Sequence, residues 1–335
     1  MGLYRALRPL VFAASPETAH RIAGSLLELP LPWEPIGGAV DHPALRTSLA
    51  GIELRNPIGL AAGFDKRCAV LGPLGRLGFG YVVGGTITSK PRTGNPKPRI
   101  ARFPARDAMV NSMGLPNPGP HAAAEALRME TRTAPRFVSV ADEDLDDVLG
   151  SFALLEPLAD AVELNASCPN VSWGRDRDTE QHLHQLTSAL AARTAKPLVV
   201  KLPPFTPGRR AERDAIVALA GAAAAAGASA LTCSNTRPVA DRRQAVGRGG
   251  LSGRPLLDGT LEAVSAAVTE TGLPVNACGG ISSAADAQAC IEAGATTVQI
   301  YTALIYRGPR ILRELTAGLA EALATNRRAP AHSAA

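Results

Sequence analysis

Aromatic residues are scarce in this sequence, at 4% of 335 residues, and charged residues reach only 19%. Hydrophobic residues account for 46%, so the chain can bury a large core and does not belong to the disordered class. The net charge of +5 comes from basic residues that are spread out and not interleaved with aromatics. This pattern argues against nucleic-acid binding and leaves a weak attraction to anionic small molecules or lipid surfaces.

The sequence also lacks the motifs typical of disulfide frameworks, zinc sites and membrane-spanning helices. The five cysteines are odd in number and include no C-x-x-C pair, which argues against a disulfide framework or a zinc site. No apolar stretch approaches the roughly 20 residues of a spanning helix. No secretory h-region with a cleavage site opens the chain. We therefore expect a cytoplasmic protein without a bound metal.

The N-terminal segment predicts two short amphipathic helices. LYRALRPLVFAA (residues 3–14) has apolar residues at helical spacing with arginines among them. Ser15-Pro16 is typical of an N-cap followed by proline in the first turn of a second helix. The proline-rich LPLPWEPIGG (29–38) ends the pair and links it to the rest. We expect a helical extension over 1–45, a main domain over 46–326 and a disordered tail over 327–335.

From about residue 50 the pattern of strand, loop and helix repeats eight times. Short apolar runs lie at 56–62, 81–86, 136–140, 160–165, 197–202, 229–235, 273–280 and 296–301. Helical segments separate them, including the alanine-rich 211–226 and a segment over 282–294 that Gly294 ends. Eight such units predict a (β/α)₈ TIM barrel with its chemistry at the C-terminal strand ends. A doubly wound sheet is the alternative, but no G-x-G-x-x-G follows the first strand.

One barrel connection is unusually long. The segment from Thr236 to Arg254 carries five arginines, and long structured loops usually serve function or are partly disordered. For the arginines in its middle we expect a solvated loop.

Polar residues and glycines follow the strand ends. They are Gly63, Asp65, Lys66, Thr86, Ser139, Asn165, Cys168, Lys201, Ser234, Asn235, Thr236, Gly279, Gly280, Tyr301 and Thr302. Glycines and small residues in the last two loops suit a phosphate, because backbone N–H groups must approach its oxygens closely. Tight turns are the alternative explanation.

Four asparagines form a second candidate set: Asn111, Asn165, Asn170 and Asn235. An amide offers donor and acceptor together, so several converging asparagines suit a planar ring with alternating N–H and C=O groups, such as a pyrimidine. Each one alone is better explained as a residue that caps a loop or occupies a turn. Their convergence at one face of the barrel is what favours the ligand.

Lys201 and Cys168 each allow more than one interpretation. A lysine inside a strand needs an anion, which could be an internal carboxylate or a flavin ring that becomes negative on reduction. Cys168 could be a buried small residue, a nucleophile or a general base. No histidine lies near a recognisable motif to support a nucleophile, so abstraction of a carbon-bound proton fits better than nucleophilic attack. On these residues alone a buried structural cysteine is the preferred interpretation.

Eight motifs together resemble the dihydroorotate dehydrogenase family, flavin enzymes that oxidise dihydroorotate to orotate in de novo pyrimidine synthesis. The motifs are NPIGLAAGFDK, GTITSKPRTGNPKPR, NSMGLPN, ELNASCPN, KLPP, GGLSGRP, ACGGISS and VQIYTALIYRGP. The likeness covers about residues 3–320 and is in register with all eight units.

The resemblance implies roles for the matched positions. Those that match FMN contacts are Ala62, Gly63, Phe64, Asp65, Lys66, Thr86, Ser139, Asn165, Lys201, Ser234, Gly253, Gly280, Tyr301 and Thr302. Those that match dihydroorotate contacts are Lys66, Asn111, Ser112, Met113, Gly114, Leu115, Asn165, Asn170, Asn235 and Thr236. Cys168 matches the base that takes the C5 proton while the C6 hydride passes to flavin N5, and Lys201 is the second residue assigned to catalysis.

Features of two classes of this family are mixed. Cys168, NSMGLPN and VVKLPPF are similar to the soluble, fumarate-using class, because the quinone-using class ordinarily has a serine base and N-R-M-G-F-N-N. The helix pair, AAGFDK, GNPKPR, GLSGRP and IYTALIYRGP are similar to the quinone class, in which the pair lies on the membrane and forms a tunnel to the flavin. We expect a quinone acceptor, with fumarate as the alternative, and reversible association with the inner face of the cell membrane.

Two other functions are consistent with the same motifs. One is a paralogue that oxidises another dihydropyrimidine-like compound. The other is a flavin-binding or membrane-docking protein without turnover, against which Cys168 argues, because a binding module has no need of a base.

Overall fold

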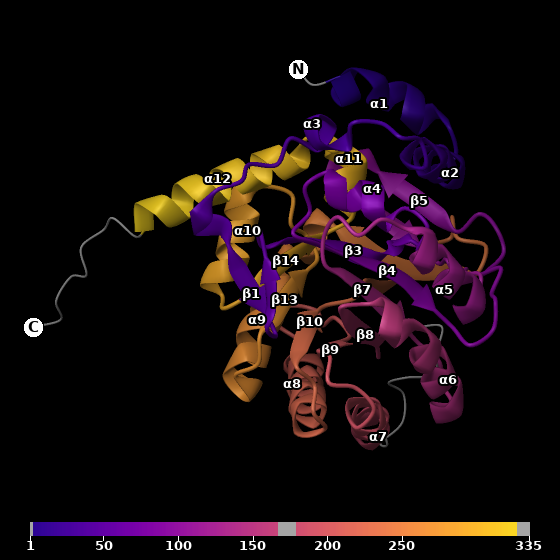
Figure 1. Cartoon of the computed structure of the whole chain (residues 1–335), viewed down its shortest axis with the longest axis vertical. Coiled ribbons are helices and arrows are strands. Elements are labelled where there is room, and N and C mark those ends of the chain that lie inside the picture. The colour runs from indigo at the N-terminus through magenta and orange to yellow at the C-terminus, as the bar shows by residue number, and fades with distance from the viewer. Residues whose placement is uncertain (1–2, 167–178, 327–335) are drawn as a thin grey trace, which may run out of the picture.

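Eight parallel strands close into a barrel, as the sequence predicts (Figure 1). The structure is a computed structural model that describes residues 3–166 and 179–326. In order around the barrel the strands are β3 (Ile58–Asp65), β4 (Tyr81–Ile87), β7 (Arg136–Val140), β8 (Ala161–Asn165), β9 (Leu198–Lys201), β10 (Ala230–Cys233), β13 (Val275–Cys278) and β14 (Thr297–Ile300). Each strand falls on one of the eight apolar runs, so the barrel prediction is confirmed.

Helices between the strands cover the outside of the barrel. They are α4 (Leu71–Arg76), α5 (Pro120–Met129), α6 (Leu145–Leu155), α7 (Thr179–Ala191), α8 (Arg210–Ala225), α9 (Leu257–Thr271), α10 (Ala284–Glu292), α11 (Thr302–Arg307) and α12 (Ile311–Asn326). The described residues also include the 3₁₀ turns η1 (Pro43–Leu45), η2 (Pro104–Arg106), η3 (Glu156–Leu158) and η4 (Arg254–Leu256), of which η3 follows α6 and η4 precedes α9. Gly294 has φ +106° just after α10, which confirms it as a helix stop.

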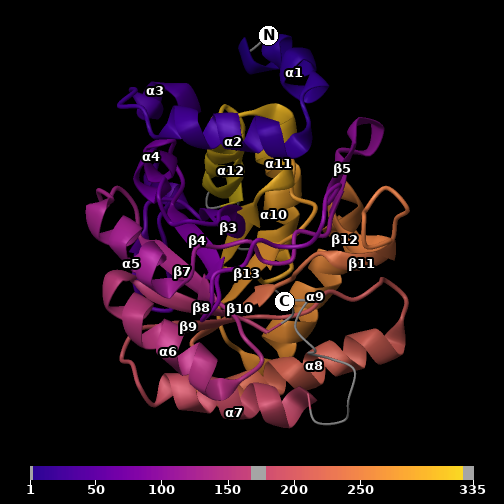
Figure 2. The ribbon, with the colours of Figure 1, turned by 90° about the vertical axis from the view of Figure 1, so that its right-hand side faces the viewer.

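The two helices of the N-terminal extension lie together over one end of the molecule (Figure 2). They are α1 (Leu3–Ala13) and α2 (Pro16–Leu27). The Ser15 hydroxyl accepts the backbone N–H of Thr18 at 3.2 Å, so the N-cap prediction is confirmed. The proline-rich segment, expected only to link, contains a further short helix, α3 (Trp33–Gly37). Its Trp33 is buried, and this packing stabilises the short helix α3.

Two antiparallel sheets supplement the barrel. The hairpin of β1 (Thr47–Leu49) and β2 (Ile52–Leu54) buries Leu49 and Leu54 against the inward side chains Tyr81 and Phe137. The second sheet has the order β11 (Arg237–Ala240), β12 (Arg248–Gly253), β6 (Ala108–Asn111) and β5 (Ile100–Phe103). The hairpin closes one end of the barrel with apolar side chains and leaves the polar end for the site.

The segment 236–254 is therefore a β-hairpin and not a loop, which corrects the sequence-based expectation. Its strands carry arginine, proline and glycine in place of alternating apolar residues. They are ordered by tertiary pairing, because β12 pairs with β6 and β11 pairs with β12. Arg242, Arg243 and Arg248 are exposed as expected.

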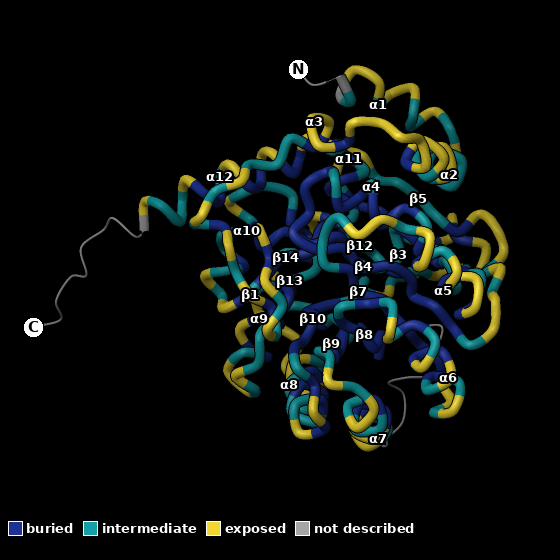
Figure 3. The backbone as a smooth tube through the Cα atoms, in the orientation of Figure 1, coloured by how far each residue is buried: buried dark blue, intermediate teal, exposed yellow. Residues whose placement is uncertain are grey.

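Most residues of α1, α2 and α3 are exposed or only partly buried (Figure 3). Seven large hydrophobic side chains in this part are exposed: Leu7, Leu10, Ile22, Leu26, Leu29, Leu31 and Ile36. No helix among the described residues is long and apolar enough to cross a membrane. Exposed apolar patches of this kind mark interaction sites.

Candidate active site

One cavity of about 1200 Å³ connects the C-terminal end of the barrel with the underside of the helical extension. Its walls include the ends of β3, β8, β9, β13 and β14, strand β12, and both α1 and α2. The strand ends lie where barrel chemistry is expected, and the helices extend the same space toward the surface.

Most predicted site residues in the described part of the chain line this cavity. They are Ala62, Gly63, Phe64, Asp65, Lys66, Thr86, Asn111, Met113, Gly114, Leu115, Asn165, Lys201, Ser234, Asn235, Thr236, Gly253, Gly280, Tyr301 and Thr302. Ser139 and Ser112 are buried just outside it: Ser139 shares a 3.0 Å hydrogen bond with Thr86, and Ser112 donates to Gln244 at 3.0 Å. Cys168 and Asn170 lie outside the described residues.

The amide side chains converge, as the sequence predicts. Asn165 Nδ2 donates to Thr86 Oγ1 at 3.0 Å, and Asn235 Nδ2 donates to Asn165 Oδ1 at 3.3 Å. Asn235 Oδ1 also accepts the N–H of Thr236 at 2.8 Å. Asn111 reaches the same cavity from β6, beside β12. The hydrogen bonds hold the amides in one orientation at the wall of the cavity, as recognition of a planar polar ring requires.

Two lysines bring positive charge to the site. Lys201 is 5% exposed and pairs in register with Asn165 on the neighbouring strand. Lys66 Nζ donates to the carbonyl of Gly63 at 2.6 Å, and burial lowers the pKa of Lys66 to about 8. Both lysines line the cavity, so this part of the cavity suits an anion.

Asp65 lines the cavity, but its carboxylate binds the backbone of the turn that follows β3. Its carboxylate accepts the backbone N–H groups of Arg67 at 3.1 Å and Val70 at 2.7 Å. Burial raises the pKa of Asp65 and these hydrogen bonds oppose the shift. The residue thus holds the turn that carries Lys66.

Two glycines in the cavity wall, which we call the glycine cradle, lie at the end of β12 and after β13. Gly253 has φ +91°, and a Cβ there would lie 2.1 Å from the Asp107 carbonyl oxygen. Gly280 has φ +82°, and a Cβ would lie 2.3 Å from the backbone nitrogen of Leu257. Only glycine fits both positions without movement of the backbone, and such backbone suits a phosphate group.

Gln299 was not predicted from the sequence and lies at the floor of the cavity. It is 2% exposed, and neither amide atom meets hydrogen-bond geometry with a described residue. The amide does lie near the Tyr81 hydroxyl, where it opposes the rise that burial causes in the pKa of Tyr81. A polar residue between two apolar ones in β14 was the available signal. Its incompletely satisfied amide and the glycine cradle both fit a large polar cofactor.

An aromatic cluster in the cavity wall joins α2 to the strand ends. Phe64 packs edge-on against His20 of α2 and Tyr301, at 5.3 and 5.5 Å between ring centroids. Burial lowers the pKa of His20 to about 4, so the imidazole is neutral near pH 7. Sequence reasoning missed His20, because only the docking of α2 brings it to Phe64.

The chain resembles known proteins over most of its length. The family model for dihydroorotate dehydrogenase matches residues 44–323. The chain is 36% identical over 348 residues to a Roseiflexus sp. (strain RS-1) protein named dihydroorotate dehydrogenase (quinone), covering 96% of this chain and 94% of that protein. It is 39% identical over 333 residues to one of the same name from Sphingopyxis alaskensis, covering 94% and 91%. A crystal structure of DHODH from Eimeria tenella in complex with ferulenol aligns with a TM-score of 0.80 at 29% identity, over 93% of this chain and 92% of that one.

Proposed function

The chain belongs to the dihydroorotate dehydrogenase family, and on that basis we propose that it oxidises dihydroorotate to orotate and passes the electrons to a quinone. The observation that carries the proposal is the single cavity shared by the polar barrel site and the apolar helix pair. A polar substrate and an apolar acceptor need two chemically different compartments that reach one redox centre. The relatives named for a quinone acceptor align with the extension as well as with the barrel.

The fit of the cavity to FMN rests on features of this chain. The glycine cradle at Gly253 and Gly280 would take the phosphate, and Lys201 would face the ring. Thr86, Asn165 and Ser234 present polar atoms at the strand ends, while Thr302 follows β14. When bound, FMN supplies a two-electron acceptor.

The chain's own residues would bind the substrate and move its proton. Asn111, Asn165 and Asn235 offer donors and acceptors to the dihydropyrimidine ring, with Asn170 a fourth by resemblance. Lys66, when protonated, would balance the carboxylate of the substrate. We assign the removal of the C5 proton to Cys168 because a thiol near neutrality can act as a base.

The helical part of the cavity would admit the quinone. Leu7, Leu10, Val11 and Ile22 line it with apolar side chains, and neutral His20 adds no charge to it. Leu10 is 73% exposed, so the same helices present apolar surface outward. We propose that this surface rests reversibly on the cytoplasmic face of the membrane, where quinones are dissolved.

The test is anaerobic reduction of the purified protein. It should be yellow, dihydroorotate should bleach the flavin, and a short-chain quinone should restore the colour. Intact flavin that dihydroorotate does not bleach would reject the substrate. Reoxidation by fumarate and not by the quinone would reject the acceptor.

A cysteine variant tests the base. Cys168→Ala should slow bleaching by a factor of about 10² to 10⁴, the usual contribution of a general base. Cys290→Ala is the matched control, because Cys290 is buried outside the cavity. Equal rates for wild type and Cys168→Ala would show that the base is another group.

A further inference from the structure

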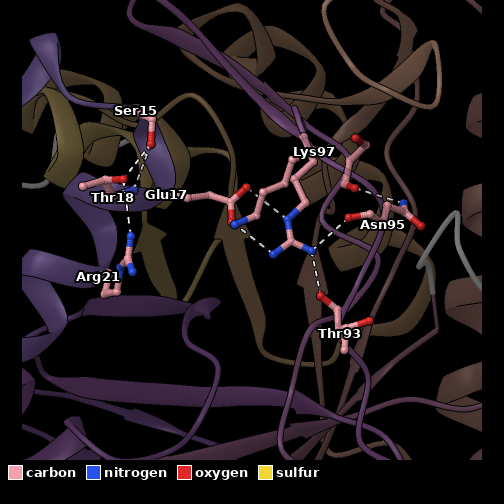
Figure 4. A network of polar contacts seen from close by, with 9 residues as sticks. Ser15, Glu17, Thr18, Arg21, Thr93, Asn95 and Lys97 are labelled. Atoms are coloured by element: carbon pink, nitrogen blue, oxygen red, sulfur yellow. Dashed lines mark hydrogen bonds and ion pairs between the residues drawn. The ribbon is translucent and has the colours of Figure 1, made fainter.

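An ion pair joins helix α2 of the extension to the barrel beside the site (Figure 4). Arg99 donates from Nε to Glu17 Oε1 and from Nη2 to Glu17 Oε2, each at 3.1 Å. The Arg99 side chain is only 10% exposed, so this two-pronged pair is shielded from water and from salt. Lys97 also reaches Glu17, at 3.2 Å, but its side chain is 68% exposed and adds little.

The same guanidinium fixes the loop that precedes β5. Arg99 Nη1 donates to the carbonyl of Thr93 at 2.7 Å and to that of Asn95 at 3.1 Å. Four hydrogen bonds from one buried side chain thus hold α2 and residues 93–95 together. Without Glu17, the guanidinium would keep its charge but lose the only carboxylate that it contacts among the described residues.

That loop in turn holds the segment predicted to bind the substrate. Asn95 donates its backbone N–H to the Met113 carbonyl and its Nδ2 to the Ser112 carbonyl, both at 2.9 Å. The contact is tight, because a Cβ on Gly94 would lie 2.2 Å from the same Met113 oxygen. The Ser112 N–H also donates to the Arg99 carbonyl at 2.9 Å. The substrate segment therefore rests on the loop that Arg99 fixes.

From this chain of contacts we propose that Glu17, on the helix pair that faces the acceptor, is a positioning residue for dihydroorotate binding. It acts through Arg99 and the 93–95 loop on residues 111–115. The inference rests on the proposed function and deepens it. The helical extension then does more than form the quinone mouth: it keeps the substrate side in its binding geometry, and the two ends of the cavity are coupled.

Glu17 also acts on Lys66 through its charge. The charged and titratable groups that face Lys66 are Asp65, Glu17, Arg99 and His20. The two carboxylates hold the pKa of Lys66 up, against burial and Arg99. Removing the Glu17 charge should lower that pKa, so Lys66 would lose its proton, and the site its attraction for the substrate anion, at a lower pH.

The experiment compares Glu17→Gln with wild type in the flavin-loaded protein without any quinone. Dihydroorotate is mixed anaerobically and the bleaching rate is followed against its concentration, while orotate binding is read from the change in the flavin spectrum. Glu17→Gln should weaken both affinities about tenfold, a typical coupling effect, with little change in the bleaching rate at saturation. The alkaline loss of affinity should begin at a lower pH than in wild type.

Glu34→Gln is the matched control. Glu34 on α3 also pairs with the barrel, through Arg76 at 3.9 Å, but makes no contact with the 93–95 loop. It should leave both affinities unchanged. Arg99→Lys keeps the charge and loses the forked contacts, so it should weaken binding without the alkaline shift.

The outcomes distinguish an error in the proposed activity from an error in the role assigned to Glu17. Failure of wild type to bleach would reject the proposed function itself. Wild type that bleaches, with unchanged dihydroorotate and orotate affinities in Glu17→Gln, would overturn the role of Glu17. Equal weakening in Glu17→Gln and Glu34→Gln would also overturn it, because the effect would then be a general loosening of the extension.

Discussion

Replacing Lys66 by methionine should make the substrate-free protein more stable while removing its affinity for dihydroorotate. Lys66 donates one hydrogen bond, to the Gly63 carbonyl at 2.6 Å. Burial lowers its pKa from 10.5 to about 8, with Asp65 opposing the shift and Arg99 adding to it. A cation held away from water without full compensation destabilises the folded state. Methionine keeps an unbranched apolar side chain and removes the charge.

The sign and size of the effect follow from the pKa. Because the pKa is lower in the folded chain than in the unfolded chain, the folded state binds the proton more weakly. The penalty is fully present below pH 8 and disappears as pH rises through 8 toward 10.5. At about 1.4 kcal/mol per pKa unit, it amounts to at most on the order of 3 kcal/mol at pH 7.

Denaturant unfolding of the protein freed of flavin and substrate, at pH 7 and pH 10, measures this difference. Lys66→Met should exceed wild type in free energy of unfolding by about 1 to 3 kcal/mol at pH 7 and by less at pH 10. Titration of the flavin-loaded protein with orotate should show its binding lost. Lys90→Met, at an exposed lysine, should change stability by about 0.5 kcal/mol or less. A Lys66→Met protein that is less stable at pH 7, or whose advantage is the same at both pH values, would refute the reasoning.

Three other substitutions give distinct results. Gly280→Ala should yield protein that loses its flavin on gel filtration, because the new Cβ would lie 2.3 Å from the Leu257 nitrogen at φ +82°; retained flavin would contradict the cradle. Cys168→Ser should keep the flavin but move the pH dependence of bleaching upward, since a hydroxyl is a much weaker acid than a thiol; an unmoved profile would argue against the base. Ser15→Ala should destabilise α2 by about 1 kcal/mol, through loss of the bond to Thr18, and Ser25→Ala within the helix should not.

Periodicity along the chain was sufficient to predict the elements that make the barrel. The run at 81–86 became β4 (Tyr81–Ile87), and the run at 136–140 became β7 (Arg136–Val140). Buried parallel strands are continuous apolar runs, so they are visible without knowledge of their neighbours. The antiparallel sheet was missed because β12 pairs Gly250 with Asn111 across more than a hundred residues, and its strands have no apolar alternation.

The site residues likewise include some that the sequence predicts and some that depend on tertiary contacts. Barrel topology brings the residues that follow the strand ends to one face, which is why Asn165, Lys201 and Tyr301 could be predicted. His20 could not, because its place in the site depends on how α2 docks. Gln299 left only the signal of a polar residue inside an apolar strand, and the surroundings of its amide are set by the tertiary structure.

The sequence by itself determined the eight-unit barrel, the helix pair and the family motifs, because local hydrophobic periods and strand-end positions follow directly from the order of residues. Only the tertiary structure decided that α2 lies against Arg99 and the 93–95 loop, since the pairing of Glu17 with Arg99 spans 82 residues. No local pattern encodes such a contact, because its energy arises only when both partners leave water together at the packed interface.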